Sequence, residues 1–209
     1  MTIKNYDQLS SLELDTLKEI GSIGTGNAAT SLSALIGKPV RIQMPEVRIM
    51  GYNEAIEWIG GPEEITAGVL VGMSGQISGI MLSVQQLEFV NLVLDSMLGQ
   101  SVGDYMELQE LEHSALTEVG NIMISTFINA LSGLAGIDIE LTVPAFTVDM
   151  QGAIMAVPMA EYGGQSDYIM TIGGDFVCNG KEIPCRLLLS PDIRSLNFLL
   201  RKLGVDSGE

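Results

Sequence analysis

Residues 15–45, DTLKEIGSIGTGNAATSLSALIGKPVRIQMP, and residues 114–144, SALTEVGNIMISTFINALSGLAGIDIELTVP, are two versions of one pattern. They align without a gap at an offset of 99 residues. The pairs that match are Leu17 with Leu116, Glu19 with Glu118, Gly21 with Gly120, Leu32 with Leu131, Gly37 with Gly136, and Pro45 with Pro144. A repeat of this kind constrains the whole architecture, because each copy forms the same local unit.

The similarity continues beyond these stretches. Residues 80–83 (IMLS) precede an amphipathic stretch that ends at residue 99, and residues 187–190 (LLLS) precede one that ends at residue 204. Each copy therefore reads as a long helix, strands and a short helix, with the second long helix at about 107–135. Apolar runs and alternation predict strands near 39–50, 66–74 and 77–84 in the first copy and near 138–149, 152–159, 167–176 and 182–189 in the second.

The repeats span about 10–99 and 107–205, and residues 99–107 form a short linker. We expect one α/β (α+β) domain over residues 1–209 with approximate two-fold symmetry. Its long helices pack on an extended sheet, which is mainly antiparallel because short turns join successive strands. Gly37 and Gly136 stand where helices end, and Pro191 can open the last helix.

The second long helix should carry a polar stripe. At about 100° per residue, Ser114, Glu118, Asn121 and Ser125 fall within about 60° of one another. The residues expected on the buried side are Leu116, Val119, Met123, Phe127 and Leu134. The first helix repeats this arrangement, with Asp15, Glu19 and Ser22 outward and with Leu17, Ile20 and Leu35 inward. By itself, such a stripe is typical of a solvated helix face.

Gly21 and Gly120 lie inside the two long helices, where each costs about 1 kcal/mol relative to alanine. A glycine at this position in both copies indicates that something packs closely there. The partner is either another helix of this chain or an incoming protein.

Composition excludes several classes of protein. The formal net charge is −16, from 26 acidic and 10 basic residues. Such a field repels nucleic acid and anionic membrane surfaces. The start of the chain lacks the apolar core of a signal peptide, and no run approaches the roughly 18 apolar residues of a membrane span. We expect a cytoplasmic protein without a metal cluster or cofactor of its own.

The two cysteines flank a predicted tight turn at Asn179-Gly180. In a two-residue hairpin Cys178 faces Lys181, so a bridge between Cys178 and Cys185 is not expected. Both should be reduced thiols in the core.

The stripe and the proline beyond it resemble the CheC/CheX/FliY family of bacterial chemotaxis phosphatases. The family pattern is an acid or serine, three residues, Glu, two residues, Asn, and then 22 residues to Pro. The second copy matches it fully with Ser114, Glu118, Asn121 and Pro144. The first copy matches with Asp15, Glu19 and Pro45, but Ser22 replaces the asparagine. The resemblance covers essentially the whole chain, and the length matches the CheC members.

The resemblance implies a CheC-like fold and hydrolysis of the aspartyl-phosphate of the response regulator CheY. Because an acyl phosphate is already reactive, the enzyme mainly has to position a water molecule. Asn121 would do this, since an amide both donates and accepts hydrogen bonds. Glu118 would anchor the regulator through a lysine, Mg²⁺ would belong to the regulator, and the receptor deamidase CheD would be a further partner.

The first copy leaves alternatives open. The Ser22 hydroxyl is shorter than an amide, so the site of Asp15, Glu19, Ser22 and Pro45 is expected to be weak or silent. A protein that mainly docks CheD and CheY, with little catalysis of its own, is therefore the second hypothesis. A structural piece of the flagellar switch is the third.

Overall fold

The computed structural model describes residues 6–162 and 167–205. The helices are η1 (Tyr6–Gln8), α1 (Ser11–Ile36), α2 (Tyr52–Ile59), α3 (Leu87–Leu98), η2 (Tyr105–Glu107), α4 (Glu110–Ala135), α5 (Gln151–Tyr162) and α6 (Ile193–Lys202). The strands are β1 (Val40–Gly51), β2 (Ile65–Gly75), β3 (Gly79–Gln85), β4 (Ile139–Leu141), β5 (Ala145–Met150), β6 (Tyr168–Cys178) and β7 (Lys181–Pro191).

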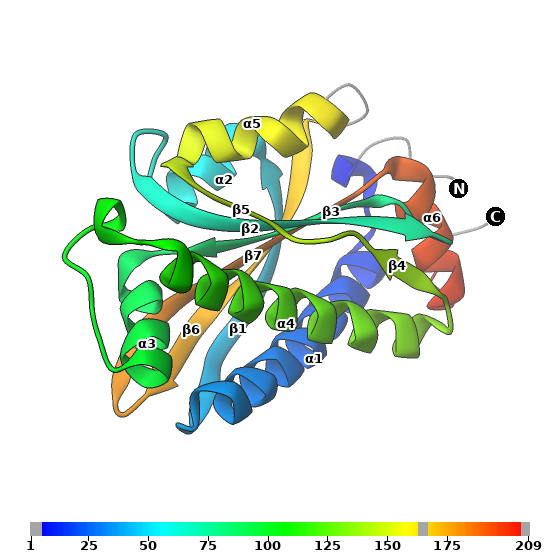
Figure 1. Cartoon of the computed structure of the whole chain (residues 1–209). Coiled ribbons are helices and arrows are strands. Elements are labelled where there is room, and N and C mark those ends of the chain that lie inside the picture. The colour runs from blue at the N-terminus through cyan, green and yellow to red at the C-terminus, as the bar shows by residue number, and fades with distance from the viewer. Residues whose placement is uncertain (1–5, 163–166, 206–209) are drawn as a thin grey trace.

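The seven strands form one sheet in the order β1-β6-β7-β3-β2-β4, with β5 also paired to β2 (Figure 1). Every pairing is antiparallel, so the predicted α/β (α+β) class with a mainly antiparallel sheet is confirmed. In the repeat, β1 corresponds to β4 and β5, β2 to β6, and β3 to β7. When these strands are exchanged, the strand order reads the same from either edge of the sheet. Because each copy supplies the edge strand for the other, we infer that the two repeats form one domain.

Both edge strands are interrupted at the repeated proline. In β1, Gln43 pairs with Asp175 of β6 and Glu46 pairs with Gly173, so β1 has one more residue than β6 between the two pairs. This extra residue makes a β-bulge, which contains Pro45. On the other edge, β4 ends at Leu141 and β5 begins at Ala145, with Pro144 between them. Proline lacks the N–H that a ladder requires, so edge strands and bulges are where a sheet accommodates it.

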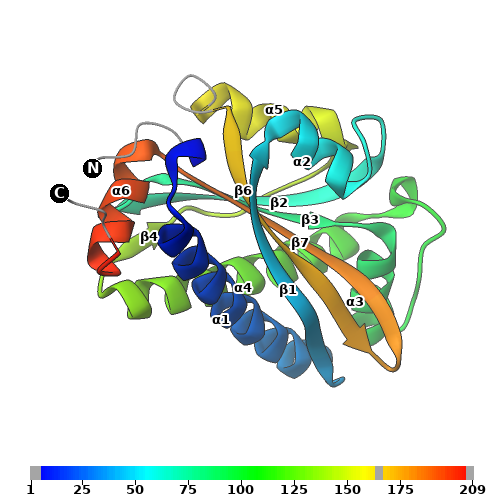
Figure 2. The same ribbon diagram turned by 180° about the vertical axis from the view of Figure 1, so that it is seen from behind.

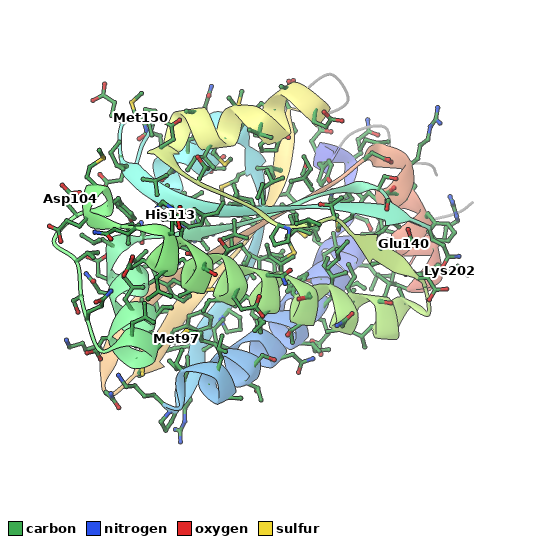
Figure 3. All side chains as sticks on the ribbon, viewed as in Figure 1. Met97, Asp104, His113, Glu140, Met150 and Lys202 are labelled. Atoms are coloured by element: carbon green, nitrogen blue, oxygen red, sulfur yellow. The ribbon has the colours of Figure 1, made fainter. Side chains whose placement is uncertain are left out.

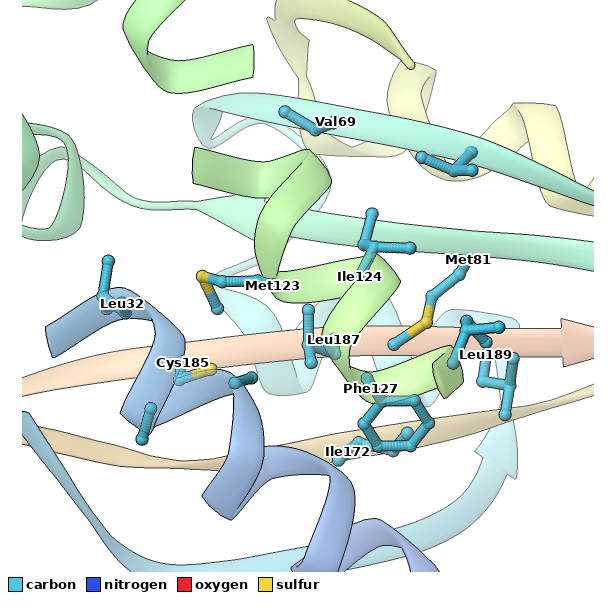
Figure 4. Packing of buried hydrophobic residues seen from close by; sticks show 14 of the residues in the cluster. Leu32, Val69, Met81, Met123, Ile124, Phe127, Ile172, Cys185, Leu187 and Leu189 are labelled. Atoms are coloured by element: carbon cyan, nitrogen blue, oxygen red, sulfur yellow. The ribbon is translucent and has the colours of Figure 1, made fainter. Parts of the chain in front are cut away.

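Two helix layers cover the sheet. The long helices α1 and α4 lie side by side on one face, and α2 and α5 cover the other (Figures 1 and 2). The larger core lies under the long helices, where Phe127, Met123 and Ile124 of α4 meet Leu187 and other sheet residues (Figure 4). A smaller core lies under α2 and α5. No helix in the described ranges is long and apolar enough to cross a membrane.

The repeated glycines let the long helices approach the sheet. A Cβ atom on Gly21 would lie 2.2 Å from Val47 Cγ2, and one on Gly120 would lie 2.6 Å from Val69 Cβ. The close neighbour is therefore the chain's own sheet, so both expected alternatives, another helix and an incoming protein, were wrong. Gly24 serves the contact between the two helices, because a Cβ there would lie 2.4 Å from the Phe127 ring.

Several local predictions were wrong. Residues 152–159, predicted as a strand, form most of helix α5, and helix α2 was not predicted. Pro191 is the last residue of β7, and the side chain of Asp192 caps α6 instead. Leu134 is 47% exposed, because it lines a hollow beside Ile23 of α1 and Leu203 instead of packing on the sheet. The strand predicted at 138–149 is divided into β4 and β5, and the helix predicted from 107 begins at Glu110.

The C-terminal hairpin forms as expected. Cys178 pairs with Lys181, and Asn179 and Gly180 have φ values of 51° and 77°. Both cysteines are free and buried, and burial raises the pKa of Cys185 to about 12. Gly37 and Gly136 end the long helices with φ values of 66° and 62°, which confirms their predicted role as C-terminal caps.

Two glycine substitutions on α4 test the close packing. Gly120→Ala should lower the free energy of unfolding by about 1–3 kcal/mol, because the new methyl group collides with Val69. Gly133→Ala is the matched control, since a Cβ there has no neighbour within 4 Å. It should raise the stability by up to about 1 kcal/mol. Urea unfolding measures both, and equal effects would contradict the proposed packing.

Candidate active site on helix α4

The predicted stripe lies on the outer side of α4. Ser114 and Glu118 are exposed, and Asn121 and Ser125 are half-buried. On the inner side, Leu116, Val119 and Met123 are buried against the sheet. Gln85 of β3 strengthens this attachment, because its side-chain amide donates a 3.1 Å hydrogen bond to the Leu116 carbonyl. The stripe therefore lies on a helix whose other face is fixed to the sheet.

Glu118 and Asn121 lie one helical turn apart, so their side chains are neighbours. Within the described residues, the Glu118 carboxylate has no ion pair and the Asn121 amide has no hydrogen bond. The Ser125 hydroxyl donates to the backbone carbonyl of Asn121 and leaves the side-chain amide untouched. Both functional groups are thus available to an incoming molecule.

A capping box holds the start of each long helix. Ser10 and Glu13 form it on α1, and Gln109 and Glu112 form it on α4. Both glutamates are buried, which is unusual for carboxylates. Backbone hydrogen bonds keep the pKa of Glu112 below its usual value, and the Gln100 amide also donates to this carboxylate. The first turn of the stripe helix is therefore fixed at its N-terminus.

The stripe of the first copy has different surroundings. Asp15, Glu19 and Ser22 are exposed on α1, but Asp15 forms a 3.1 Å ion pair with Lys18. The second copy has Thr117 at the position of Lys18, without a charge. Sequence reasoning missed Lys18, although its i, i+3 spacing from Asp15 indicates the pair. A hollow of about 330 Å³, lined by Glu19, Ile23, Leu134, Leu203 and neighbours, borders this stripe.

The remaining predicted residues lie on the edge strands. Pro144 is half-buried between β4 and β5, and Pro45 is exposed in the bulge of β1. Neither proline lies on a stripe helix, so both shape the sheet edge and add no polar group to the stripe.

His113 precedes Ser114 in the first turn of α4 (Figure 3). It is half-buried, with its ring centroid 4.9 Å from that of Phe146 on β5. It therefore contributes to packing. Within residues 6–162 and 167–205, no three His, Cys, Asp or Glu side chains are grouped so that they could hold a metal ion.

The family model that matches the chain is that of the CheC-like family, over residues 12–49 and 111–148. These two ranges cover nearly all of the long helices α1 and α4, most of β1, and β4. Along the whole chain, the CheY-P phosphatase CheC of Bacillus subtilis (strain 168) is 23% identical over 203 residues, which cover 95% of this chain and 97% of that protein.

Solved structures share the fold. FliY of Thermotoga maritima matches with a TM-score of 0.73 and 22% identity, over 96% of this chain and 100% of that one. A chain of the CheX–CheY–BeF3–Mg²⁺ complex of Borrelia burgdorferi matches with a TM-score of 0.52 and 17% identity, over 83% of this chain and 96% of that one.

The unpaired amide gives a stability prediction. Asn121→Ala should raise the free energy of unfolding by about 0.5 kcal/mol, because alanine has the higher helix propensity and no hydrogen bond is lost. The matched control is Asn197→Ala on α6, where the buried amide donates a 2.7 Å bond to the Ile193 carbonyl. It should lower stability by about 1–3 kcal/mol. A comparable loss with Asn121→Ala in thermal or urea unfolding would assign Asn121 a structural role.

Proposed function

We propose that this chain, which matches the model of the CheC-like family over residues 12–49 and 111–148, hydrolyses the aspartyl-phosphate of the response regulator CheY. The observation that carries the proposal is the adjacent pair of Glu118 and Asn121, whose side chains have no partner among the described residues. The helix that carries them is held to the sheet by Gln85 and at its N-terminus by the capping box. Two relatives or structural neighbours support the choice of substrate. One is named a CheY-P phosphatase, and the other is a complex that contains CheY.

The reaction is displacement at phosphorus by water. A bond forms between the water oxygen and phosphorus while the bond from phosphorus to the aspartyl oxygen breaks, which gives inorganic phosphate and a free carboxylate. Asn121 orients the water by accepting a hydrogen bond from it through Oδ1, which directs a lone pair of the water oxygen toward phosphorus. No residue of this chain has to become a nucleophile, because the gain comes from positioning.

Glu118 anchors the regulator. An unpaired, exposed carboxylate next to Asn121 suits an ion pair with a lysine of the regulator's active site. The net charge of −16 favours a partner with basic residues at its contact face. The Mg²⁺ ion belongs to the regulator in this scheme, and this chain supplies the amide and the carboxylate.

The first copy is proposed to be weak or silent. The Ser22 hydroxyl is on a shorter side chain than an amide, so a water bridged to it would lie closer to the helix. Lys18 and Asp15 also form an ion pair next to Glu19, and a partner lysine would have to fit beside that pair, which the second stripe lacks. Two features of the first stripe therefore oppose the role proposed for the second.

The second candidate function is docking of CheY and CheD with little hydrolysis. The observation that favours it is the degenerate first stripe, since Glu19 keeps an anchoring group where Ser22 lacks the amide. The two functions differ in one measurement, the decay of phosphorylated CheY. Docking alone leaves that decay at its intrinsic rate, with or without CheD.

Catalysis is tested with trace amounts of this protein and phosphorylated CheY. The unsubstituted chain should accelerate phosphate release, and Asn121→Ala should remove at least about nine-tenths of the acceleration through lost water positioning. Asn129→Ala is the matched control, because Asn129 is an exposed asparagine on the same helix that lies about 12 Å beyond Asn121 along the helix axis. Equal activity of both variants would contradict the assignment, and no acceleration by the unsubstituted chain would favour docking.

Restoring the family residue tests the first copy. In an Asn121→Ala background, Ser22→Asn should raise phosphate release above that background, and adding Lys18→Thr should raise it further. Both changes make the first stripe resemble the second. Steady-state phosphate release is the measurement. If the first stripe, without these changes, already gives as much phosphate release as the second stripe, the proposed difference between the two copies is wrong.

A further inference from the structure

Leu111 is a large apolar residue that the fold does not use. It lies in the first turn of α4 and is 62% exposed. Its counterpart at the same place in the repeat, Leu12 on α1, is 61% exposed. Matching residues in a repeat normally persist because they pack the core, but a leucine exposed to this degree contributes little to it. The pair therefore calls for an explanation outside folding.

Leu111 lies in line with the proposed catalytic pair. It precedes Glu118 by seven residues, which turns it only about 20° from Glu118 and places it about 10 Å along the helix axis. Leu111 thus shares the outer face of α4 with Ser114, Glu118, Asn121 and Ser125, about 20° around the helix from Glu118 and about 80° from Asn121. A molecule docked over Glu118 and Asn121 reaches Leu111 if it extends two turns toward the start of the helix.

The position of Leu111 is also fixed. The next residue, Glu112, is 7% exposed and accepts a 3.0 Å hydrogen bond from the backbone N–H of Gln109 in the capping box. The neighbouring η2 turn is attached to the sheet through the Tyr105 hydroxyl, which donates to the Gln85 carbonyl. A side chain presented by such a rigid turn loses little conformational freedom on binding, which suits an interface anchor.

We propose that Leu111 is an apolar docking anchor for the response regulator and inserts among apolar side chains beside its phosphorylation pocket. This inference rests on the proposed function. An ordinary interface covers about 800 Å² on each partner, a patch of about 16 Å radius. A patch of this size centred on Glu118 includes Leu111. The anchor contributes affinity by burial, whereas Glu118 contributes it by charge.

Binding is measured with CheY activated by beryllofluoride, which is not hydrolysed, and turnover is measured with phosphorylated CheY. Leu111→Ala should weaken binding about tenfold and raise KM correspondingly, with kcat within about twofold. Leu111→Met should restore most of the affinity. The salt dependence of binding should match that of the unsubstituted chain, whereas Glu118→Ala should reduce it. Val157→Ala is the control, an exposed apolar residue on α5 across the sheet.

The outcomes separate the two proposals. If the unsubstituted chain binds and dephosphorylates CheY while Leu111→Ala does both equally well, the anchor is wrong and the phosphatase proposal stands. If Leu111→Ala lowers kcat without weakening binding, the docking role is also wrong. If the unsubstituted chain neither binds CheY nor accelerates its dephosphorylation, both proposals fail. Unfolding in urea should give the same stability for Leu111→Ala and the unsubstituted chain within about 0.5 kcal/mol.

Discussion

The exchange of strands between the two repeats is the constraint on which this structure depends. β1 of the first copy pairs with β6 of the second, and β2 pairs with β4 and β5. The central pairing, β3 with β7, also joins the copies. Hydrogen bonding of the sheet is therefore largely a property of the whole chain, and the long helices rest on a surface to which both copies contribute. Gly120 of the second copy, for example, lies on Val69 of the first.

The rigid support of α4 connects this sheet to the proposed chemistry. Catalysis by positioning requires that an amide be held where water must attack, and a shift of about 1 Å can be costly. α4 is held at its start by the capping box, along its inner face by Gly120 and Gln85, and at its side by α1 through Phe127 and Gly24. None of these contacts occupies the outer face. The helix can therefore be rigid while its functional groups remain free.

Much of the fold was predictable because the repeat constrains it. The long helices, their glycine caps and the C-terminal hairpin follow from local chemistry that acts within a few residues. The error at residues 152–159 arose because a short apolar run looks the same in a strand and in a buried helix. The repeat offset of 99 residues also holds for α2 and α5, and the buried positions of both helices recur with the i, i+3, i+4, i+7 spacing of a helix. These positions are Tyr52, Ala55, Ile56 and Ile59 in α2 and Gln151, Ile154, Met155 and Pro158 in α5.

The polar stripe was predictable from periodicity, but its availability was not. Whether Glu118 and Asn121 have partners depends on residues far away in the sequence, as does the identity of the element beneath Gly120. The ion pair between Asp15 and Lys18 is local and was predictable, although the sequence analysis did not include it. The exposure of Leu134 could not be inferred from a helical wheel, because it depends on how α1 and Leu203 leave a hollow beside it.

The interleaved strands also have a consequence for biosynthesis. When the ribosome has delivered the first 100 residues, β1 has no partner, since β6 is still about 70 residues from being made. The nascent half then holds an unpaired edge and the apolar inner face of α1, the kind of surface that aggregates or recruits chaperones. Native pairing has to wait for nearly the complete chain, so contacts that are distant in sequence should govern the folding rate.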